Sequence, residues 1–508
     1  MHRTCLLLPI ISWEILNRLV QSIIFQFNAP LLVVYLLTFK VRIMKFTIHQ
    51  RYITLAQVLI LPLAITFSSC KKLIEIPANP NDKVSTPRVF SDSLNVLGAL
   101  TGIYATFGTG GFGGSINTGY TSIYTSLASD ELVALNPDEF NTNAIQVTSG
   151  TVSQIWRSAY AGIYQCNAFI EGLAASNSVS ASFRQQVTGE VLTARSLYYF
   201  HLVNQFGDVP IITGTDFKVN ALEKRMPADS VYGFILKDLT SAAGMLKVQY
   251  PSPGRMRPNL HVVRALLAKV YLYRGAWQQA ADLSGQIIQS GTYELVEPSK
   301  TFLDGSKEAL WQMPSLSTFA GIVDAMSLVP WSNTIAPNYY LSSYLTDAFE
   351  ANDLRKQAWL SLNNVVSGTT TTPYYYPGKY KKTDVYATPL EGYMFFRLSE
   401  QYLINAEALA KLNQLDAARL SLNKVRNRAG LLNTTAVSQE EVLAAIEKER
   451  FTELFAEQGN RWYDLKRIGK ITSVLGARKT GFTATDALFP IPLNEINTNI
   501  NMTQNPGY

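Results

Sequence analysis

RLSEQYLINAEALAKLNQLDAARLSLNKVRNRAG, residues 397–430, decides the fold of this chain. Apolar residues recur along it at helical spacing, and the polar pair Asn413 and Gln414 interrupts the pattern. The stretch therefore predicts two helices joined by a short turn. Counted from the first small residue, positions at offsets 0, 3, 7, 9 and 12 are Ala406, Leu409, Asn413, Leu415 and Ala418.

A segment well over a hundred residues upstream repeats this pattern. The same offsets there are occupied by Ala268, Tyr271, Gly275, Trp277 and Ala280. Small residues let two antiparallel helices approach closely, the break residue turns the chain, and the large residue fills the groove between units. This pattern is tetratricopeptide-like, and one unit cannot bury its own apolar face, so we expect several units to stack. The predicted fold class is mostly α: a helical-repeat scaffold with a loop-rich irregular face.

Composition and charge favour a globular protein without a nucleic-acid partner. The 508 residues are 47% apolar and 16% charged, which suits a large folded core. Six of the 44 basic residues but only one of the 38 acidic residues lie in the first 69 positions, so 38 basic and 37 acidic residues remain beyond them. That near balance leaves no basic excess for phosphate binding.

Cysteine and histidine are scarce. Cys5, Cys70 and Cys166 are the only cysteines, and His201 and His261 are the only histidines beyond position 69. No disulfide framework or cysteine-based zinc site can be built from so few residues, and a histidine base has few candidates. We name no catalytic residue, no metal ligand and no cofactor, and leave a structural metal ion open.

Residues 1–69 form a predicted leader. Within it, residues 44–69 have a positive start, about fifteen mostly apolar residues and a small-residue end, as a signal peptide has. This apolar run is too short to span a bilayer, which takes about twenty residues. The sequence FSSC that ends at Cys70 resembles a lipobox, which predicts that Cys70 is acylated. We interpret residues 1–43 as an upstream extension, although their own apolar stretch leaves a membrane helix as the alternative.

Three segments are expected after the leader. An extended tether spans 70–90, an N-terminal helical region spans 91–260, and a C-terminal region spans 261–508. Within the last region, residues 299–388 are rich in Ser, Thr, Pro and Tyr and lack a sustained helical period. We expect them to form loops on the helical scaffold, where binding groups usually lie.

Aromatic and amide side chains of this irregular segment are the predicted ligand-binding residues. Aromatic rings stack on sugar rings or on peptide side chains, and amides bond to hydroxyl groups. The alternative is that the rings only pack the loops down. The candidates are Trp331, Asn333, Tyr339, Tyr340, Tyr374, Tyr375 and Tyr376. The segment 108–124 is the second choice.

Two further patterns have both a structural and a functional interpretation. GTGGFGG at 108–114 matches a nucleotide-binding glycine spacing, but no strand precedes it, so we expect a loop. Glu449, Glu453 and Glu457 lie on one helical face, where two carboxylates could mimic the spacing of a retaining glycosidase. Because charged helix faces are usually paired or solvated, we expect a buried network with the charged residues of 450–467 instead.

Several motifs, taken in order, resemble the SusD/RagB family of outer-membrane lipoproteins. They are the lipobox at Cys70, the helix at 156–167, GEVLTARSLYYFHLVNQFGDVPI (189–211), RLSEQYLINAEA (397–408), ERFTELFAEQGNRWYDLKRIG (449–469) and PIPLNEINTNINMTQNPGY (490–508). The resemblance covers essentially all of 70–508. It implies a mostly α-helical, SusD-like fold in which tetratricopeptide-like helix pairs form a scaffold beneath a loop-rich face.

The resemblance also implies a non-enzymatic role. It implies a lipoprotein of the outer membrane that faces the cell exterior and binds a nutrient, most often an oligosaccharide and in some members a peptide. The partner would be a TonB-dependent transporter of the SusC/RagA type, capped by the helical repeats while the loop face holds the ligand. Lys71 and Lys72 stand where many surface-exported relatives have acidic residues, which weakens the expectation of outward display.

Two other functions stay open from the residues alone. One is a lipid-anchored glycoside hydrolase that would use Glu453 and Glu457. The other is a tetratricopeptide-type scaffold that assembles envelope proteins and binds no small ligand.

Overall fold

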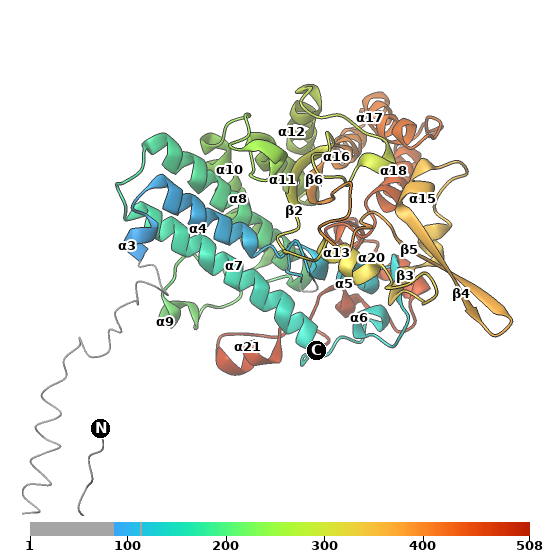
Figure 1. Ribbon diagram of the computed structural model, residues 1–508, viewed down its shortest axis with the longest axis horizontal. Helices are drawn as coiled ribbons and strands as arrows, with labels where there is room; N and C mark the ends of the chain where they lie inside the picture. Colours follow the sequence, from blue (N-terminus) through green and yellow to red (C-terminus); the bar gives the residue numbers. More distant parts are fainter. Residues whose placement is uncertain (1–85, 112–113) are drawn as a thin grey trace, which may run out of the picture. The chain divides into compact units, whose positions relative to one another are not determined.

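The computed structural model describes residues 86–111 and 114–508 (Figure 1). The predicted leader and Cys70 lie outside the described residues, as does most of the tether. The last tether residues form the short helix α3, Thr86–Val89, and Phe90 after it is buried. In the described part of the chain, no helix combines the length and apolar character needed to cross a membrane.

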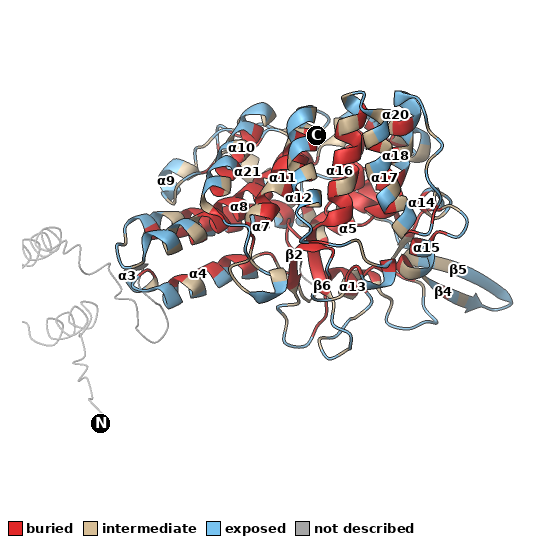
Figure 2. Ribbon diagram, turned by 90° about the horizontal axis from the view of Figure 1, so that it is seen from above, coloured by how far each residue is buried: buried red, intermediate tan, exposed pale blue. Residues whose placement is uncertain are grey.

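Long helices make up most of the described chain, and successive helices pack side by side. They are α4 Ser93–Ala105, α7 Gly150–Ala174, α8 Ala181–Phe206, α10 Ala228–Met245, α11 Leu260–Tyr273, α12 Trp277–Gln289, α16 Leu398–Lys411, α17 Leu415–Arg428 and α18 Gln439–Glu453. The packing runs from α4 through α7, α8, α10, α11 and α12 to α16, which contacts both α17 and α18. Figure 2 shows that the buried residues gather on the faces these helices turn toward one another.

The two predicted repeats are the helix pairs α11–α12 and α16–α17, which confirms the tetratricopeptide-like fold class. Gly275 and Asn413, at the break positions, both have left-handed backbone with φ of 72° and 59°. A residue in this conformation ends a helix and reverses the chain. The small residues of the pattern are fully buried at Ala268, Ala280, Ala406 and Ala418.

The two repeats stack through α12 and α16. Ala268 and Ala280 of the first repeat share a buried cluster with Ile404 and Ala408 of the second. Because these side chains are small, the helices approach closely. A second buried cluster joins α16, α17 and α18, so the array continues past the second repeat.

Shorter helices connect and cover the array. They are α5 Gly119–Ala128, α6 Glu139–Thr142, α9 Phe217–Asn220, α13 Val323–Leu328, α14 Ser343–Thr346, α15 Leu354–Trp359, α19 Asn460–Arg467, α20 Ile471–Arg478 and α21 Leu493–Thr498, with turns of 3-10 helix at Pro253–Arg255, Pro298–Lys300 and Ala484–Ala487. The sequence shows no regular period over 120–140, yet α5 forms there with most of its residues buried. A helix buried on nearly all sides has no polar face to create a period. The second-choice binding segment 108–124 therefore ends in the core.

In the described residues, three antiparallel strand pairs interrupt the helices. β1 Leu132–Ala134 pairs with β3 Tyr339–Leu341, β2 Ala309–Pro314 with β6 Gly392–Arg397, and β4 Leu360–Ser367 with β5 Thr370–Pro377. The last pair is a ribbon that projects from the body and turns at Gly368, where φ is 60° (Figure 1). Loop structure was therefore a wrong prediction for 370–377, where β5 forms. The segment 299–388 contributes the strands β2 to β5 and the helices α13, α14 and α15.

Candidate functional site

The predicted binding residues lie on two neighbouring pieces of the irregular segment. One is the stretch 331–341, which ends in β3, and the other is β5, which lies beside β3. Trp331 begins the first piece with 80% of its surface exposed. Asn333 is exposed as well.

Asn363 of β4 fixes the first piece against the ribbon. Its side chain is 4% exposed, and its amide nitrogen donates to the carbonyl oxygens of Ser332 at 2.9 Å and Ile335 at 3.0 Å. Asn363 lies directly opposite Tyr374 in the β4–β5 register, so the two side chains share one face of the ribbon. The ribbon thus holds the loop that carries Trp331. Sequence analysis did not identify Asn363, because its partners are backbone atoms about thirty positions away.

Tyr340 and Tyr374 are brought together by the same arrangement. Their rings meet edge to face, with 5.3 Å between centroids and an interplanar angle of 78°. Burial, and then the neighbouring Tyr374, raise the pKa of Tyr340, so the Tyr340 ring stays neutral. We call Trp331, Tyr340 and Tyr374 the aromatic platform.

The other tyrosines are placed differently. Side chains alternate along a strand, so Tyr376 shares the face of Tyr374, whereas Tyr375 lies on the opposite face. Tyr339 alternates with Tyr340 in the same way, and burial together with Tyr124 raises its pKa to about 12. Tyr339 therefore packs toward the body, as the alternative interpretation expected, and Tyr375 does not join the aromatic platform.

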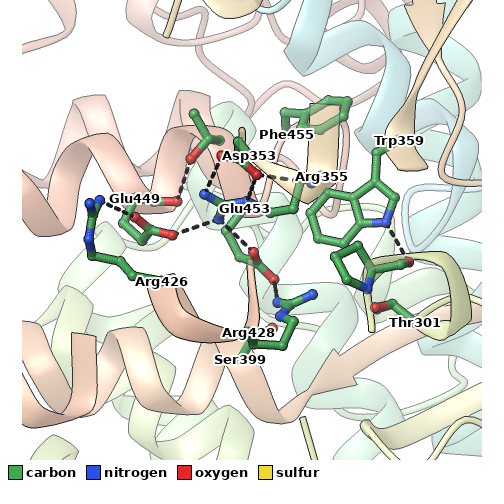
Figure 3. Close-up of polar contacts among 12 residues, drawn as sticks. Thr301, Asp353, Arg355, Trp359, Ser399, Arg426, Arg428, Glu449, Glu453 and Phe455 are labelled. Carbon is green, nitrogen blue, oxygen red and sulfur yellow. Dashed lines mark hydrogen bonds and ion pairs between the residues drawn. The ribbon is translucent and has the colours of Figure 1, made fainter. Parts of the chain in front are cut away.

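Glu449 and Glu453 of α18 form a buried network with arginines (Figure 3). Glu457 joins this network, but it lies beyond the helix, which ends at Glu453, and not on the same helical face as expected. Arg355 Nη1 donates to Glu449 at 2.6 Å and to Glu453 at 2.8 Å, and Arg397 Nη2 donates to Glu457 at 2.8 Å. These contacts confirm the expected network. Its partners differ from the expected ones, because they come from α15 and from the junction of β6 and α16 rather than from 450–467.

Further charges join this network. They include Glu308, Asp353, Lys379, Arg426 and Arg428. The residues expected as partners form ion pairs elsewhere, where Arg450 and Arg467 hold Asp464 at 2.7 and 2.8 Å.

The electrostatics of this network oppose an acid role for Glu453. Burial disfavours its ionised form, but the guanidinium groups of Arg428, Arg397 and Arg355 outweigh burial and hold its pKa well below the usual value. Its side chain has no exposed surface. A glycosidase acid needs a raised pKa and contact with the substrate. Glu453 has neither property, which opposes its use as the acid of a carboxylate pair.

Other candidate sites give little chemistry. Across 86–111 and 114–508, no three His, Cys, Asp or Glu side chains are grouped so that they could hold a metal ion. The helix α4 precedes the glycine-rich segment, and Gly110 forms an antiparallel bridge with Ile322. This context lacks the strand that leads into a dinucleotide-binding loop.

Comparisons with known proteins extend these observations. The profile described as the SusD family matches residues 331–508, and the profile described as starch-binding associating with outer membrane matches residues 96–272. SusD-like protein P2 of Formosa agariphila is 27% identical over 506 residues, which cover 88% of this chain and 98% of that protein.

Two solved structures are similar to the described fold. A SusD superfamily protein from Bacteroides vulgatus matches with a TM-score of 0.73 at 20% identity, covering 82% of this chain and 100% of its own. A laminarin-binding SusD-like protein matches with a TM-score of 0.68 at 26% identity, again covering 82% of this chain and 100% of its own.

Proposed function

This chain belongs to the SusD/RagB family, and from that premise we propose that it is an outer-membrane lipoprotein that binds an oligosaccharide at the aromatic platform. It would pass the ligand to a partner TonB-dependent transporter of the SusC/RagA type. Cys70 would carry the lipid anchor. The role is binding and delivery, with no chemical step.

The observation that carries this proposal is the exposed ring of Trp331 on a loop that Asn363 holds in place. A large aromatic ring exposed to water gains free energy when a flat apolar surface covers it. A loop that is already fixed loses little conformational entropy on binding, so more of that gain appears as affinity. The C–H face of a sugar ring is a surface of the required kind.

Two findings support a carbohydrate and a non-enzymatic role. The similar structure named as laminarin-binding makes laminarin oligosaccharides the first ligands to test. The carboxylates that could have served a hydrolase are buried and paired with arginines. An exposed platform combined with enclosed carboxylates favours capture over hydrolysis.

Calorimetric titration with laminarin oligosaccharides and a panel of other glycans and peptides tests the ligand proposal. We expect saturable binding of a glycan and a loss of about 1 to 3 kcal/mol, or about 5- to 150-fold in affinity, for Trp331→Ala. Tyr375→Ala is the matched control, because Tyr375 lies on the opposite face of β5. Equal affinity of wild type and Trp331→Ala for every bound ligand would reject the platform.

The same titrations separate the competing functions. A scaffold predicts no saturable binding of any small ligand. A hydrolase predicts reducing ends that accumulate with time, and their loss in Glu453→Gln. Transporter partnership is tested by purifying the tagged protein from solubilised outer membranes, where a TonB-dependent receptor should copurify at a fixed ratio.

A further inference from the structure

A cavity of about 630 Å³ lies on elements that the aromatic platform does not use. Its walls come from the end of α8, the start of α10, the end of α11, α19 and the tail residues 503–506. The charged side chains that line it are Asp208, Arg225, Lys466 and Arg467. Asp208 is the single acid in this set, so the walls carry excess positive charge.

Lys466 lacks an acidic partner. Its Nζ donates to the carbonyl oxygen of Asn204 at 2.5 Å, and no Asp or Glu of the described chain forms an ion pair with it. An ammonium group has three N–H donors, so this single contact leaves donors over. Burial alone lowers the pKa of Lys466 to about 7.

Lys479 is a second buried lysine of the same molecule, and nearby carboxylates partly balance its charge. Its Nζ donates to the carbonyl oxygen of Leu127 at the end of α5, just as Lys466 caps the end of α8. Burial lowers the pKa of Lys479 to about 7 as well, but Asp130 and Asp138 oppose that shift. Capping a helix end accounts for both lysines. It does not explain why Lys466 has no carboxylate nearby.

Arg225 adds a second cation whose hydrogen bonds all go to neutral oxygens. Its guanidinium donates to the carbonyls of Asp208, Phe206 and Thr503 and to the side chains of Thr503 and Asn505. The negative end of a helix dipole amounts to about half a charge, so α8 cannot balance two cations. The Asp208 carboxylate balances the positive charge of these two cations only in part, because it also accepts a hydrogen bond from the Ala228 N–H at 2.8 Å.

Two further side chains, Arg467 and Tyr273, line the cavity. Arg467 is balanced, because it pairs with Glu407 and Asp464. The hydroxyl of Tyr273 is buried and has no hydrogen-bond partner among the described residues. Burial holds the pKa of Tyr273 well above its usual value, so this hydroxyl keeps its proton and can donate.

We infer that this cavity binds the oxyanion of a small acidic ligand, either a carboxylate or a sulfate, between Lys466 and the Tyr273 hydroxyl. Arg225 would supply charge rather than free donors, since its N–H groups are already engaged. Pockets of 300 to 1,000 Å³ commonly hold small molecules, so a monosaccharide-sized acid fits this volume. The site is separate from the aromatic platform and goes beyond the proposed function.

The first test uses the wild-type protein and an amine-reactive acylating reagent at pH 7. Labelling of Lys466 and Lys479 is followed by peptide mass spectrometry with sodium sulfate, sodium glucuronate or glucose, at ionic strength held constant with NaCl. A bound oxyanion raises the pKa of its lysine, and a one-unit rise from about 7 slows labelling about fivefold. We expect that slowing at Lys466 with sulfate or glucuronate and no change at Lys479.

The second test compares the affinities of variants for the same probes. Calorimetry should show binding of at least one of the two anions, weakened at least tenfold in Lys466→Met but unchanged in Lys479→Met. Binding of sulfate alone points to an inorganic ion, and tighter binding of glucuronate points to an acidic sugar. The inference fails if neither anion binds wild type, if Lys479→Met weakens binding equally, or if neither anion selectively protects Lys466. Should Lys466→Met not fold, the labelling result on wild type decides alone.

Discussion

At the scale of single residues, Glu453 is held in the interior by Arg355, Arg397 and Arg428. Removing its charge leaves these guanidinium groups with fewer acceptors in a medium that penalises unpaired charge. Breaking one partner of a buried ion pair costs about 3 to 5 kcal/mol. We expect Glu453→Gln to lower the free energy of unfolding, measured in urea, by roughly that amount.

The matched control for this variant is Glu440→Gln. Glu440 is exposed on the same helix, and exposed substitutions usually change stability by less than about 0.5 kcal/mol. A cost for Glu453→Gln no larger than that of the control would show that the network adds nothing to stability.

The buried His201 is expected to make the free energy of unfolding fall as the pH falls. Burial, and then Lys269, lower its pKa from 6.5 to about 3, so the folded protein keeps the imidazole neutral while the unfolded chain takes up a proton below about pH 6.5. The stabilising contribution is complete above pH 6.5 and is lost as the pH falls toward 3. At pH 5.5 the loss is about 1.4 kcal/mol.

The test compares wild type with His201→Asn, whose amide can reach Tyr463 as Nδ1 does at 3.1 Å. The unfolding free energy of the variant minus that of wild type should increase by about 1 kcal/mol when the pH falls from 7 to 5.5. Taking the difference removes Glu131 and Asp324, whose raised pKa values act in the opposite direction. A difference that does not vary with pH would mean that His201 binds its proton with the same pKa in the folded and the unfolded chain.

At the scale of elements, α7 and α8 meet at Gly162. A methyl group there would come within 2.2 Å of the Tyr198 ring, and Tyr198 is itself buried and bonded to Thr106 at 2.6 Å. The ring cannot give way easily, so we expect Gly162→Ala to cost about 1 to 3 kcal/mol through overpacking. Urea unfolding measures the cost.

Gly233 in α10 is the control, because its substitution by Ala should change the stability in the opposite direction. No atom lies within 4 Å of a methyl group added there, and Ala is favoured over Gly inside a helix by about 0.5 to 1 kcal/mol. Gly233→Ala should therefore stabilise the protein. If both substitutions stabilise it, the contact between α7 and α8 is looser than described.

The elements also show what could be predicted from the sequence. The repeats could be predicted because residues such as Ala406 and Asn413 belong to a helical spacing pattern that is visible over a short stretch of sequence. The strand β5 was not, because Thr370–Pro377 contains two prolines and three consecutive tyrosines, and its pairing depends on β4 rather than on its own pattern. Trp331 could be named from the sequence as a candidate binding residue. Its support by Asn363 could not be predicted, because that contact forms only in the folded chain.

At the scale of the whole described unit, the buried charges connect the proposed binding face to the helical array. Arg355 lies on α15, which runs directly into β4, and Asn363 of β4 fixes the loop of Trp331. Glu449 and Glu453 hold Arg355 from α18. The network is therefore the support beneath the aromatic platform, which explains why acidic residues that look catalytic in the sequence are needed for structure.

The proposed lipid anchor belongs to the largest scale, because it would decide where in the cell the molecule works. If Cys70 is acylated, each methylene buried in the membrane contributes about 0.8 kcal/mol, and the chain stays with the membrane after cell lysis. We expect Cys70→Ala to move the protein from the membrane fraction to the fraction released on lysis.

Cys166→Ala is the control, since the Cys166 thiol is buried and burial raises its pKa to about 12, so it cannot serve as an attachment site. Mass spectrometry of the wild-type N-terminal peptide should find it beginning at an acyl-modified Cys70. Recovery of peptides from 1–43, or membrane association that survives Cys70→Ala, would mean that another segment attaches the chain.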